Sequence, residues 1–191
     1  MIVIGLDLAG VERRPTGFCI LTGIKALTSL TYTDAEILMK ITETQPALVA
    51  IDAPLSLPPG RKSLEERTNI HLRDCDKELL KRRIKFFPVT LGPMRKLTQR
   101  GINLRHLLEA EGRVVIEAYP GGAQDVLGIP RKQMGLEKLK AGLEGYGIKG
   151  LKSELSDHEL DAVTCAYVGK LFLEGKAVTY GAPNDGIVMP K

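Results

Sequence analysis

Three carboxylates stand where carboxylates are uncommon, inside or at the end of strongly apolar segments. They are Asp7 in IVIGLDL, Asp52 in ALVAID and Glu117 in VVIEAY. Aspartate is depleted in strands, and burial of an unpaired carboxylate costs free energy. A strand end or a buried ion pair explains any one of them. Three acids in three such segments indicate a shared acidic site.

A fourth carboxylate, Asp161, lies in the segment Asp157–Glu174, whose apolar residues recur at helical spacing. Residues 156–159, S-D-H-E, fit a capping box and predict where the helix begins. Asp157, His158 and Asp161 then lie on roughly one face. Asp157 is also typical of any first helical turn, and His158 alone is typical of a surface position. Asp161 is too deep in the helix for capping.

A cluster of carboxylates needs cations. Two carboxylates ~4 Å apart repel by about 4 kcal/mol at an effective dielectric constant of 20. All-oxygen ligands suit Mg²⁺ or Mn²⁺, and two such ions ~4 Å apart can activate water and stabilise the leaving oxygen in phosphodiester hydrolysis. The predicted catalytic and metal-binding residues are Asp7, Asp52, Glu117 and Asp161, and the predicted auxiliary residues are Asp157 and His158.

The elements around these residues predict how they meet. Apolar, β-branched runs with short links predict an antiparallel meander of three strands. These runs are residues 2–8, 18–22 and 26–32. A helix then begins near Thr33 and ends at Pro46, before a fourth strand at 47–52. Such a crossover places the fourth strand parallel to the first in a mixed sheet. Asp7 and Asp52 would lie side by side near the carboxyl ends of the strands, where open α/β sheets bind ligands.

The segment 55–111 departs from this pattern. It begins with a Pro-Pro-Gly run and is mostly helical in composition. From Arg61 to Arg105 it holds 13 Lys and Arg against 5 Asp and Glu, a balance of +8 that leaves −4 elsewhere. We predict a basic helical insertion after the fourth strand, before a fifth strand at 114–119. Its charge indicates a polyanionic partner, although a solvated helical surface gives the same pattern.

Composition narrows the class of protein. A chain of 191 residues, 43% of them hydrophobic, fits one domain over 1–191 with its own core. Three widely spaced cysteines favour neither disulfides nor a zinc ribbon and predict a reducing, cytoplasmic location. No apolar run approaches the ~20 residues that span a bilayer, and no secretory signal is recognisable. The chain has no G-x-G-x-x-G or G-K-[ST] phosphate loop.

Four motifs together resemble the family called domain of unknown function 429. They are G-L-D-L-A-G (5–10), I-D-A-P-L (51–55), I-E-A-Y-P (116–120) and D-H-E-L-D-A-V-T-C-A (157–166). A further stretch of that family is matched by Arg73-Asp74-Cys75-Asp76, Leu79, Pro88, Met94, Leu97-Thr98 and Arg100-Gly101. The resemblance covers nearly the whole chain and implies a predicted nuclease of ribonuclease H-like fold.

The helix motif H-x-x-D-A at 158–162 is also similar to the last helix of RuvC-type Holliday junction resolvases, in which this aspartate binds metal. By that likeness Asp7, Asp52 and Asp161 match the metal-binding residues of the first strand, the fourth strand and the last helix. Glu117 matches only the motif of the 429 family.

The sequence therefore predicts a ribonuclease H-like α/β domain, with elements in the order β-β-β-α-β-α, that hydrolyses nucleic acid with Mg²⁺ or Mn²⁺. Arg73, Arg95 and Arg100 are predicted to hold phosphates, because guanidinium groups bind phosphate bidentately. Two alternatives stay open: a non-catalytic module that binds nucleic acid or a phosphorylated ligand, and a small-molecule phosphate hydrolase. An open, basic groove would favour a polymer, and an enclosed pocket would favour a small ligand.

Overall fold

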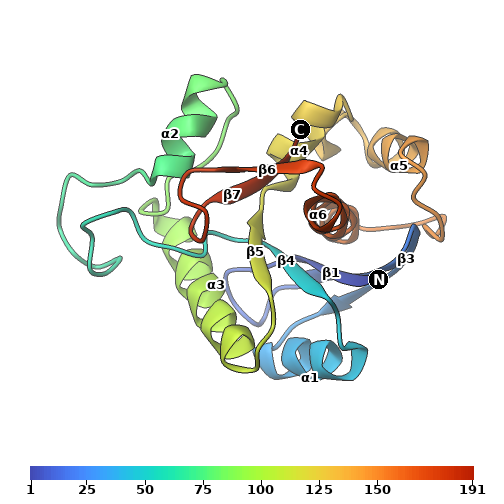
Figure 1. Ribbon diagram of the computed structural model, residues 1–191, viewed down its shortest axis with the longest axis horizontal. Helices are drawn as coiled ribbons and strands as arrows, with labels where there is room; N and C mark the ends of the chain where they lie inside the picture. Colours follow the sequence, from blue (N-terminus) through green and yellow to red (C-terminus); the bar gives the residue numbers. More distant parts are fainter.

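The computed structural model describes all 191 residues and has a seven-stranded mixed sheet at its centre (Figure 1). The strands are β1 (Ile2–Asp7), β2 (Thr16–Thr22), β3 (Lys25–Thr31), β4 (Leu48–Asp52), β5 (Val115–Ala118), β6 (Ala177–Tyr180) and β7 (Ile187–Pro190). Their order across the sheet is β3-β2-β1-β4-β5-β7-β6. Strands β1, β4, β5 and β7 run parallel, and β2, β3 and β6 are antiparallel to their neighbours. The predicted meander, crossover and mixed sheet are confirmed.

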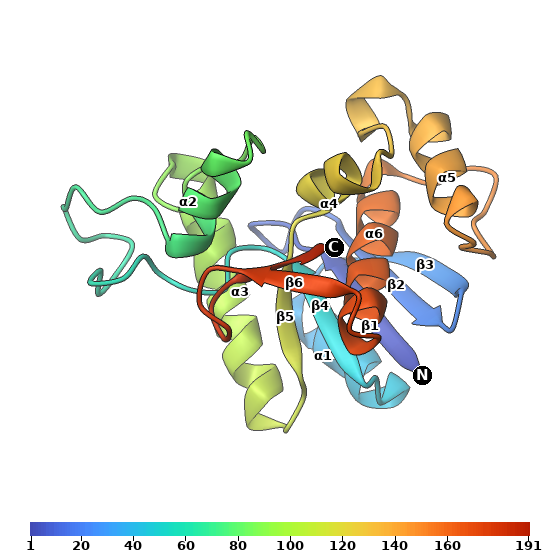
Figure 2. The same ribbon diagram turned by 45° about the horizontal axis from the view of Figure 1, so that its top comes forward.

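Helices cover both faces of this sheet (Figures 1 and 2). They are α1 (Asp34–Thr44), α2 (Asp74–Lys81), α3 (Gly92–Ala110), α4 (Pro120–Leu127), the 3₁₀ helix η1 (Lys132–Met134), α5 (Leu136–Gly145) and α6 (Asp157–Leu173). One apolar core joins α1 and α3 to the sheet, with Ile37 and Leu104 packed near Ile51. A second core joins α4, α5 and α6 to the opposite face, around residues such as Val163. None of the helices is both long and apolar enough to cross a membrane.

Helix α6 lies unusually close to β1 and β2. A Cβ atom added at Gly5 would lie 2.0 Å from the carbonyl oxygen of Ala162, and one at Gly17 would lie 1.9 Å from that of His158. Two glycines therefore let the helix backbone rest directly on the strands. The predicted capping box is confirmed, because Ser156 and Glu159 cap the helix reciprocally.

The segment 55–111 is less helical, and less separate, than predicted. Residues 53–73 form no helix or strand. Their loop is organised by the buried Arg61 side chain, which donates hydrogen bonds to the carbonyl oxygens of residues 63, 64, 66 and 70. Helix α3 packs on the sheet through Leu104 and Leu108, so this part of the segment belongs to the core. Helix α2 packs at the β6 edge of the sheet (Figure 2), where Cys75 and Leu79 form a third, smaller apolar cluster with residues of β6 and β7.

Candidate active site

The first two acids lie on adjacent strands in direct register. Asp7 of β1 pairs with Asp52 of β4, which confirms that they are neighbours. Residues in register on parallel strands point to the same face, and the strands are ~4.8 Å apart. Both side chains point to the face covered by α6, because Val3 and Ala50, which alternate in phase with them, lie in the core beneath that helix.

Helix α6 brings the third acid to the same place. The Asp161 carboxylate is buried, and both of its oxygens are occupied. Gln124 of α4 donates to Oδ1 at 2.9 Å, and the Lys132 ammonium lies 2.9 Å from Oδ2. Lys132 also lies 3.0 Å from Oδ2 of Asp157. A cation supplied by the chain itself thus joins two of the predicted acids.

His158 binds the first acid. Its Nδ1 lies 2.6 Å from Oδ2 of Asp7. This contact follows from the close approach at Gly17, because Gly17 pairs with Asp7 in the sheet and packs under the His158 backbone. The hydrogen bond to Asp7 raises the pKa of His158 above its ordinary value, against the opposing effect of partial burial. His158 therefore orients Asp7.

Asp52 has no such partner. His158, Gln124 and Lys132, which bind Asp7 and Asp161, form no hydrogen bond or ion pair with the Asp52 carboxylate. Burial raises the pKa of Asp52 well above its ordinary value, and the negative charges of Asp7 and Asp161 raise it further. The charged form of Asp52 is thus disfavoured until a cation arrives.

The ligand types suit a hard divalent cation, although the three carboxylates are too far apart to coordinate one ion in this arrangement. Asp7, Asp52 and Asp161 offer only oxygen, as Mg²⁺ and Mn²⁺ prefer, and the unpartnered Asp52 would gain from a positive charge. No group of three His, Cys, Asp or Glu side chains is close enough together to hold a metal ion. Lys132 contributes the positive charge instead, so a metal ion must share or displace its contacts.

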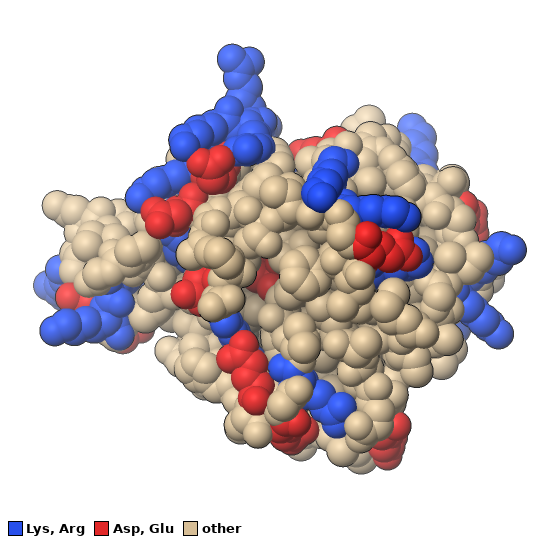
Figure 3. Space-filling model, in the orientation of Figure 1, with Lys and Arg blue, Asp and Glu red and all other residues tan.

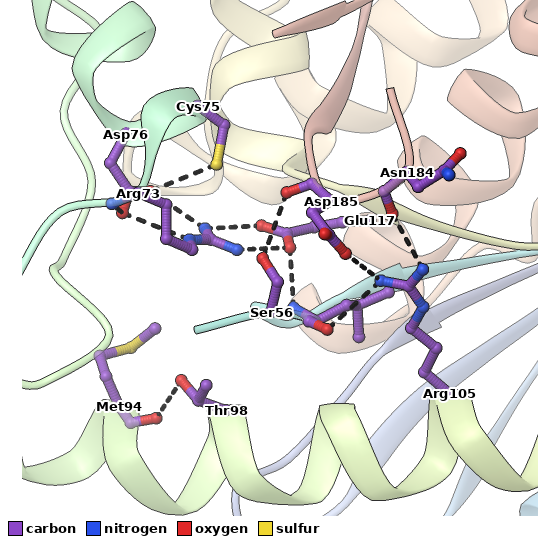
Figure 4. Close-up of polar contacts among 11 residues, drawn as sticks. Ser56, Arg73, Cys75, Asp76, Met94, Thr98, Arg105, Glu117, Asn184 and Asp185 are labelled. Atoms are coloured by element: carbon purple, nitrogen blue, oxygen red, sulfur yellow. Dashed lines mark hydrogen bonds and ion pairs between the residues drawn. The ribbon is translucent and has the colours of Figure 1, made fainter. Parts of the chain in front are cut away.

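Glu117 does not join this cluster, contrary to the prediction. It pairs with Ile51 rather than Asp52, so its side chain points to the opposite face of the sheet. There Arg73 binds both carboxylate oxygens, at 2.7 and 2.8 Å, and the backbone N–H of Leu55 donates to Oε2 at 2.8 Å (Figure 4). Glu117 is thus a buried acid in an ion pair. A buried ion pair is one of the two explanations that the sequence allows for a single acid in an apolar strand.

Two of the three predicted phosphate-binding arginines are also buried. Arg73 is 4% exposed and binds Glu117 and Asp76. Burial opposes its charge, but the Glu117 carboxylate outweighs this effect and raises the pKa of Arg73. Arg100 is 7% exposed and binds Asp34 and two backbone carbonyl oxygens. Both guanidinium groups are therefore directed at partners inside the protein, and neither is presented at the surface as a phosphate-binding group would be.

Arg95 keeps a partly exposed guanidinium. Its Nε donates to the carbonyl oxygen of Thr90, and its Nη1 lies 3.5 Å from the exposed carboxylate of Glu65. An ion pair of this length at the surface is weak. Arg95 therefore remains a candidate for phosphate contact.

A cavity of about 180 Å³ adjoins Asp52. Asp52 lines one part of it and the Arg73–Glu117 ion pair another, and most of the remaining wall is apolar, with five of its side chains from the segment 55–111. Phe86, Phe87 and Tyr119 separate it from a larger groove of about 1060 Å³, which Arg83 and Lys85 also line. The site thus combines a small pocket with an open groove that has basic residues at its edge.

Comparison with known proteins supports the resemblance. The family model described as "Protein of unknown function (DUF429)" matches residues 5–185. The chain belongs to the DUF429 family. The search of curated proteins found no match to this chain.

Two solved structures of RuvC from Thermus thermophilus share its fold. One is RuvC in complex with a Holliday junction substrate, with a TM-score of 0.55 and 15% identity over 92% of this chain and 96% of RuvC. The other is a RuvC structure with a TM-score of 0.50 and 16% identity, over 92% and 97% of the two chains. At this identity the likeness shows the fold, and it confirms the ribonuclease H-like prediction.

Sequence reasoning missed Lys132 and Gln124. Both lie between β5 and α6, where the sequence has no strong periodicity. One feature of the sequence could have indicated Gln124, because it lies four residues after the I-E-A-Y-P motif at 116–120. Nothing in the sequence separates Lys132 from its neighbours.

Proposed function

We propose that the protein hydrolyses phosphodiester bonds in nucleic acid, with Mg²⁺ or Mn²⁺ held by Asp7, Asp52 and Asp161. The register of β1 and β4 carries this proposal, because it sets two carboxylates side by side beneath a third from α6. A RuvC of the same fold, bound to a Holliday junction substrate, supports nucleic acid as the substrate class.

Each remaining group has a role in this scheme. The metal, when bound, supplies an activated water and stabilises the charge of the leaving oxygen. His158 holds Asp7 and Gln124 holds Asp161, so that neither carboxylate has to be reoriented. Lys132 neutralises Asp157 and Asp161 before the metal binds. Once released from Asp161, its ammonium group can bind a phosphate oxygen.

The groove favours a polymeric substrate over the alternatives. A small-molecule phosphate hydrolase needs only the 180 Å³ cavity. Here that cavity adjoins a groove nearly six times larger, along which Arg83 and Lys85 can meet a phosphate backbone. A non-catalytic module would explain the groove but not the unpartnered, charge-disfavoured Asp52.

Cleavage assays with labelled oligonucleotides test the proposal. We expect hydrolysis of at least one DNA, RNA, hybrid or branched substrate in Mg²⁺ or Mn²⁺, and none in EDTA. Asp52→Asn should lower the rate by a factor on the order of 100 or more, because it removes a charged ligand. Asp74→Asn is the matched control, because Asp74 is an exposed acid of α2.

Two small substrates identify the reaction class in the same assay. Hydrolysis of bis(p-nitrophenyl) phosphate with no hydrolysis of p-nitrophenyl phosphate would support a phosphodiesterase. The reverse preference would favour the small-molecule phosphate hydrolase. Equal activity of Asp52→Asn and the wild type would refute the assigned site.

A further inference from the structure

The cavity beside Asp52 has the size and lining of a site for one ring system. Its volume of about 180 Å³ is below the ~300 Å³ of pockets that take drug-sized ligands. Leu79, Phe86, Met94 and Leu97 give it apolar walls. A whole nucleotide would exceed this space, whereas a flat base would fill it.

Besides Asp52 and Asp76, Glu117 places a polar acceptor at the cavity wall. Glu117 lines the cavity, and its Oε2 accepts hydrogen bonds from Arg73 and Leu55. Its Oε1 accepts only one, from Arg73. A carboxylate oxygen has two lone pairs, so Oε1 retains an acceptor site. The N–H groups on the edge of a nucleobase are donors suited to it.

Aromatic side chains lie where the cavity adjoins the groove, and the groove carries basic residues. Phe87 lines both the cavity and the adjoining groove and is 68% exposed, which is unusual for so large an apolar side chain. Aromatic side chains beside a basic groove provide stacking platforms for unpaired bases. Arg83 and Lys85 border the groove, and neither forms an ion pair with a carboxylate. Their charges are available to phosphates.

We propose that this cavity binds an unpaired nucleobase, stacked on Phe87, of the strand whose backbone lies at Asp52. The proposal rests on the nuclease function and names its substrate class. A base in the cavity cannot remain paired in a duplex. The preferred substrate is therefore single-stranded, or carries an unpaired nucleotide at the cleavage point.

Binding without turnover tests the cavity separately from catalysis. Fluorescence anisotropy in EDTA would compare a labelled oligothymidylate of about 12 nucleotides, a length within the site sizes of single-strand-binding folds, with an abasic strand of the same length and a blunt duplex. We expect the wild type to bind oligothymidylate most tightly. Phe87→Ala should weaken that binding about tenfold, because removal of a stacking aromatic side chain has an effect of this order. Phe87→Trp should restore it.

The controls separate stacking from general effects. Phe87→Ala should leave binding of the abasic strand unchanged, because that strand has no base to stack. Leu107→Ala, which removes an exposed apolar side chain of α3 outside the cavity, should leave oligothymidylate binding unchanged. Because Phe87 is exposed, its replacement should not impair folding.

The outcomes distinguish the base site from the nuclease function. An equal decrease in affinity for the oligothymidylate and the abasic strand would overturn the base site, as would no decrease for either. If either result were found while Asp52→Asn still abolished cleavage, the nuclease function would be supported and the base site would be refuted. A base-dependent decrease in a protein that cleaves nothing would support the site and refute the function.

Discussion

Lys132 is the residue on which the resting charge of the site depends. Burial opposes its charge, but Asp161 and Asp157 outweigh this effect and raise the pKa of Lys132. The ammonium is therefore positive at neutral pH and occupies contacts that a metal ion needs. The protein can keep its acids together without metal, at the expense of metal affinity.

Lys132→Met should strengthen the binding of Mn²⁺. Removal of the competing positive charge, which lies 2.9 Å from Asp161, should raise the affinity about tenfold or more, which corresponds to about 1.4 kcal/mol. Without metal the variant should melt at a lower temperature than the wild type, because Asp157 and Asp161 would have no counter-charge. Isothermal titration with Mn²⁺ and thermal melts with and without metal measure the two effects.

Lys138→Met provides the comparison, since Lys138 is an exposed lysine of α5 that forms no ion pair. It should leave both quantities unchanged. Unaltered Mn²⁺ affinity in Lys132→Met would show that the ammonium does not compete with the metal.

Glu117 shows where residue types alone mislead. Its sequence context resembles that of Asp52, an acid near the end of an apolar strand. What separates them is a register shift of one residue, because β5 pairs Glu117 with Ile51. In a strand that shift reverses the face to which a side chain points. Register depends on pairing between strands far apart in the sequence, so the pattern of either strand could not supply it.

At the scale of elements, α6 assembles the site. Its close packing on β1 and β2 positions His158 at Asp7 and Asp161 at the cluster, and it depends on glycines in the strands rather than on the acids themselves. A glycine opposite a helix backbone allows an approach that any side chain would block.

Gly17→Ala should move α6 away from Asp7. The new Cβ would lie 1.9 Å from the His158 carbonyl oxygen, so the helix must shift. Such overpacking costs about 1–3 kcal/mol of stability, and we expect Mn²⁺ affinity to fall as well. Gly145→Ala in α5 is the matched control, because its Cβ meets nothing within 4 Å. Denaturant unfolding measures the change in stability, and Mn²⁺ titration measures the change in affinity. A Gly17→Ala variant that is less stable but binds Mn²⁺ as tightly as the wild type would show that Gly17 does not position the site.

The elements that sequence patterns predict are those with strong local signals. Strands β1–β5, α1 and α6 have apolar runs or capping motifs that mark them. Strands β6 and β7 have four residues each, too few for a clear periodicity. The Pro-Gly-Gly at 120–122 is typical of a bend, yet it begins α4, where proline is favoured in the first turn. Tertiary packing decides such short elements.

At the scale of the whole molecule, internal pairing reduces the basic character of the segment 61–105. Seven of its 13 Lys and Arg residues form ion pairs, and Arg61 is buried by backbone contacts. The five that remain are Lys62, Arg67, Arg83, Lys85 and Lys96, all exposed. In Figure 3, Lys and Arg side chains project around α2 and the loop before it, interspersed with acids. The local position of unpaired charge, rather than net charge, should therefore determine the binding of a polyanion.

Arg83 and Lys85 should account for a measurable part of the salt dependence of nucleic-acid binding. Each phosphate of a single strand that the protein neutralises adds about 0.7 to the magnitude of the slope of log affinity against log salt. The double change Arg83→Gln and Lys85→Gln should therefore lower that magnitude by about 1.4, if both residues bordering the groove bind phosphates. The change Lys138→Gln and Lys149→Gln removes the same net charge from exposed lysines outside the groove and should leave the slope nearly unaltered. Anisotropy titrations of oligothymidylate in EDTA over a range of KCl concentrations give both slopes. An equal decrease in the two double variants would mean that net charge attracts the strand, and an unchanged slope in the first would place the phosphates away from this groove.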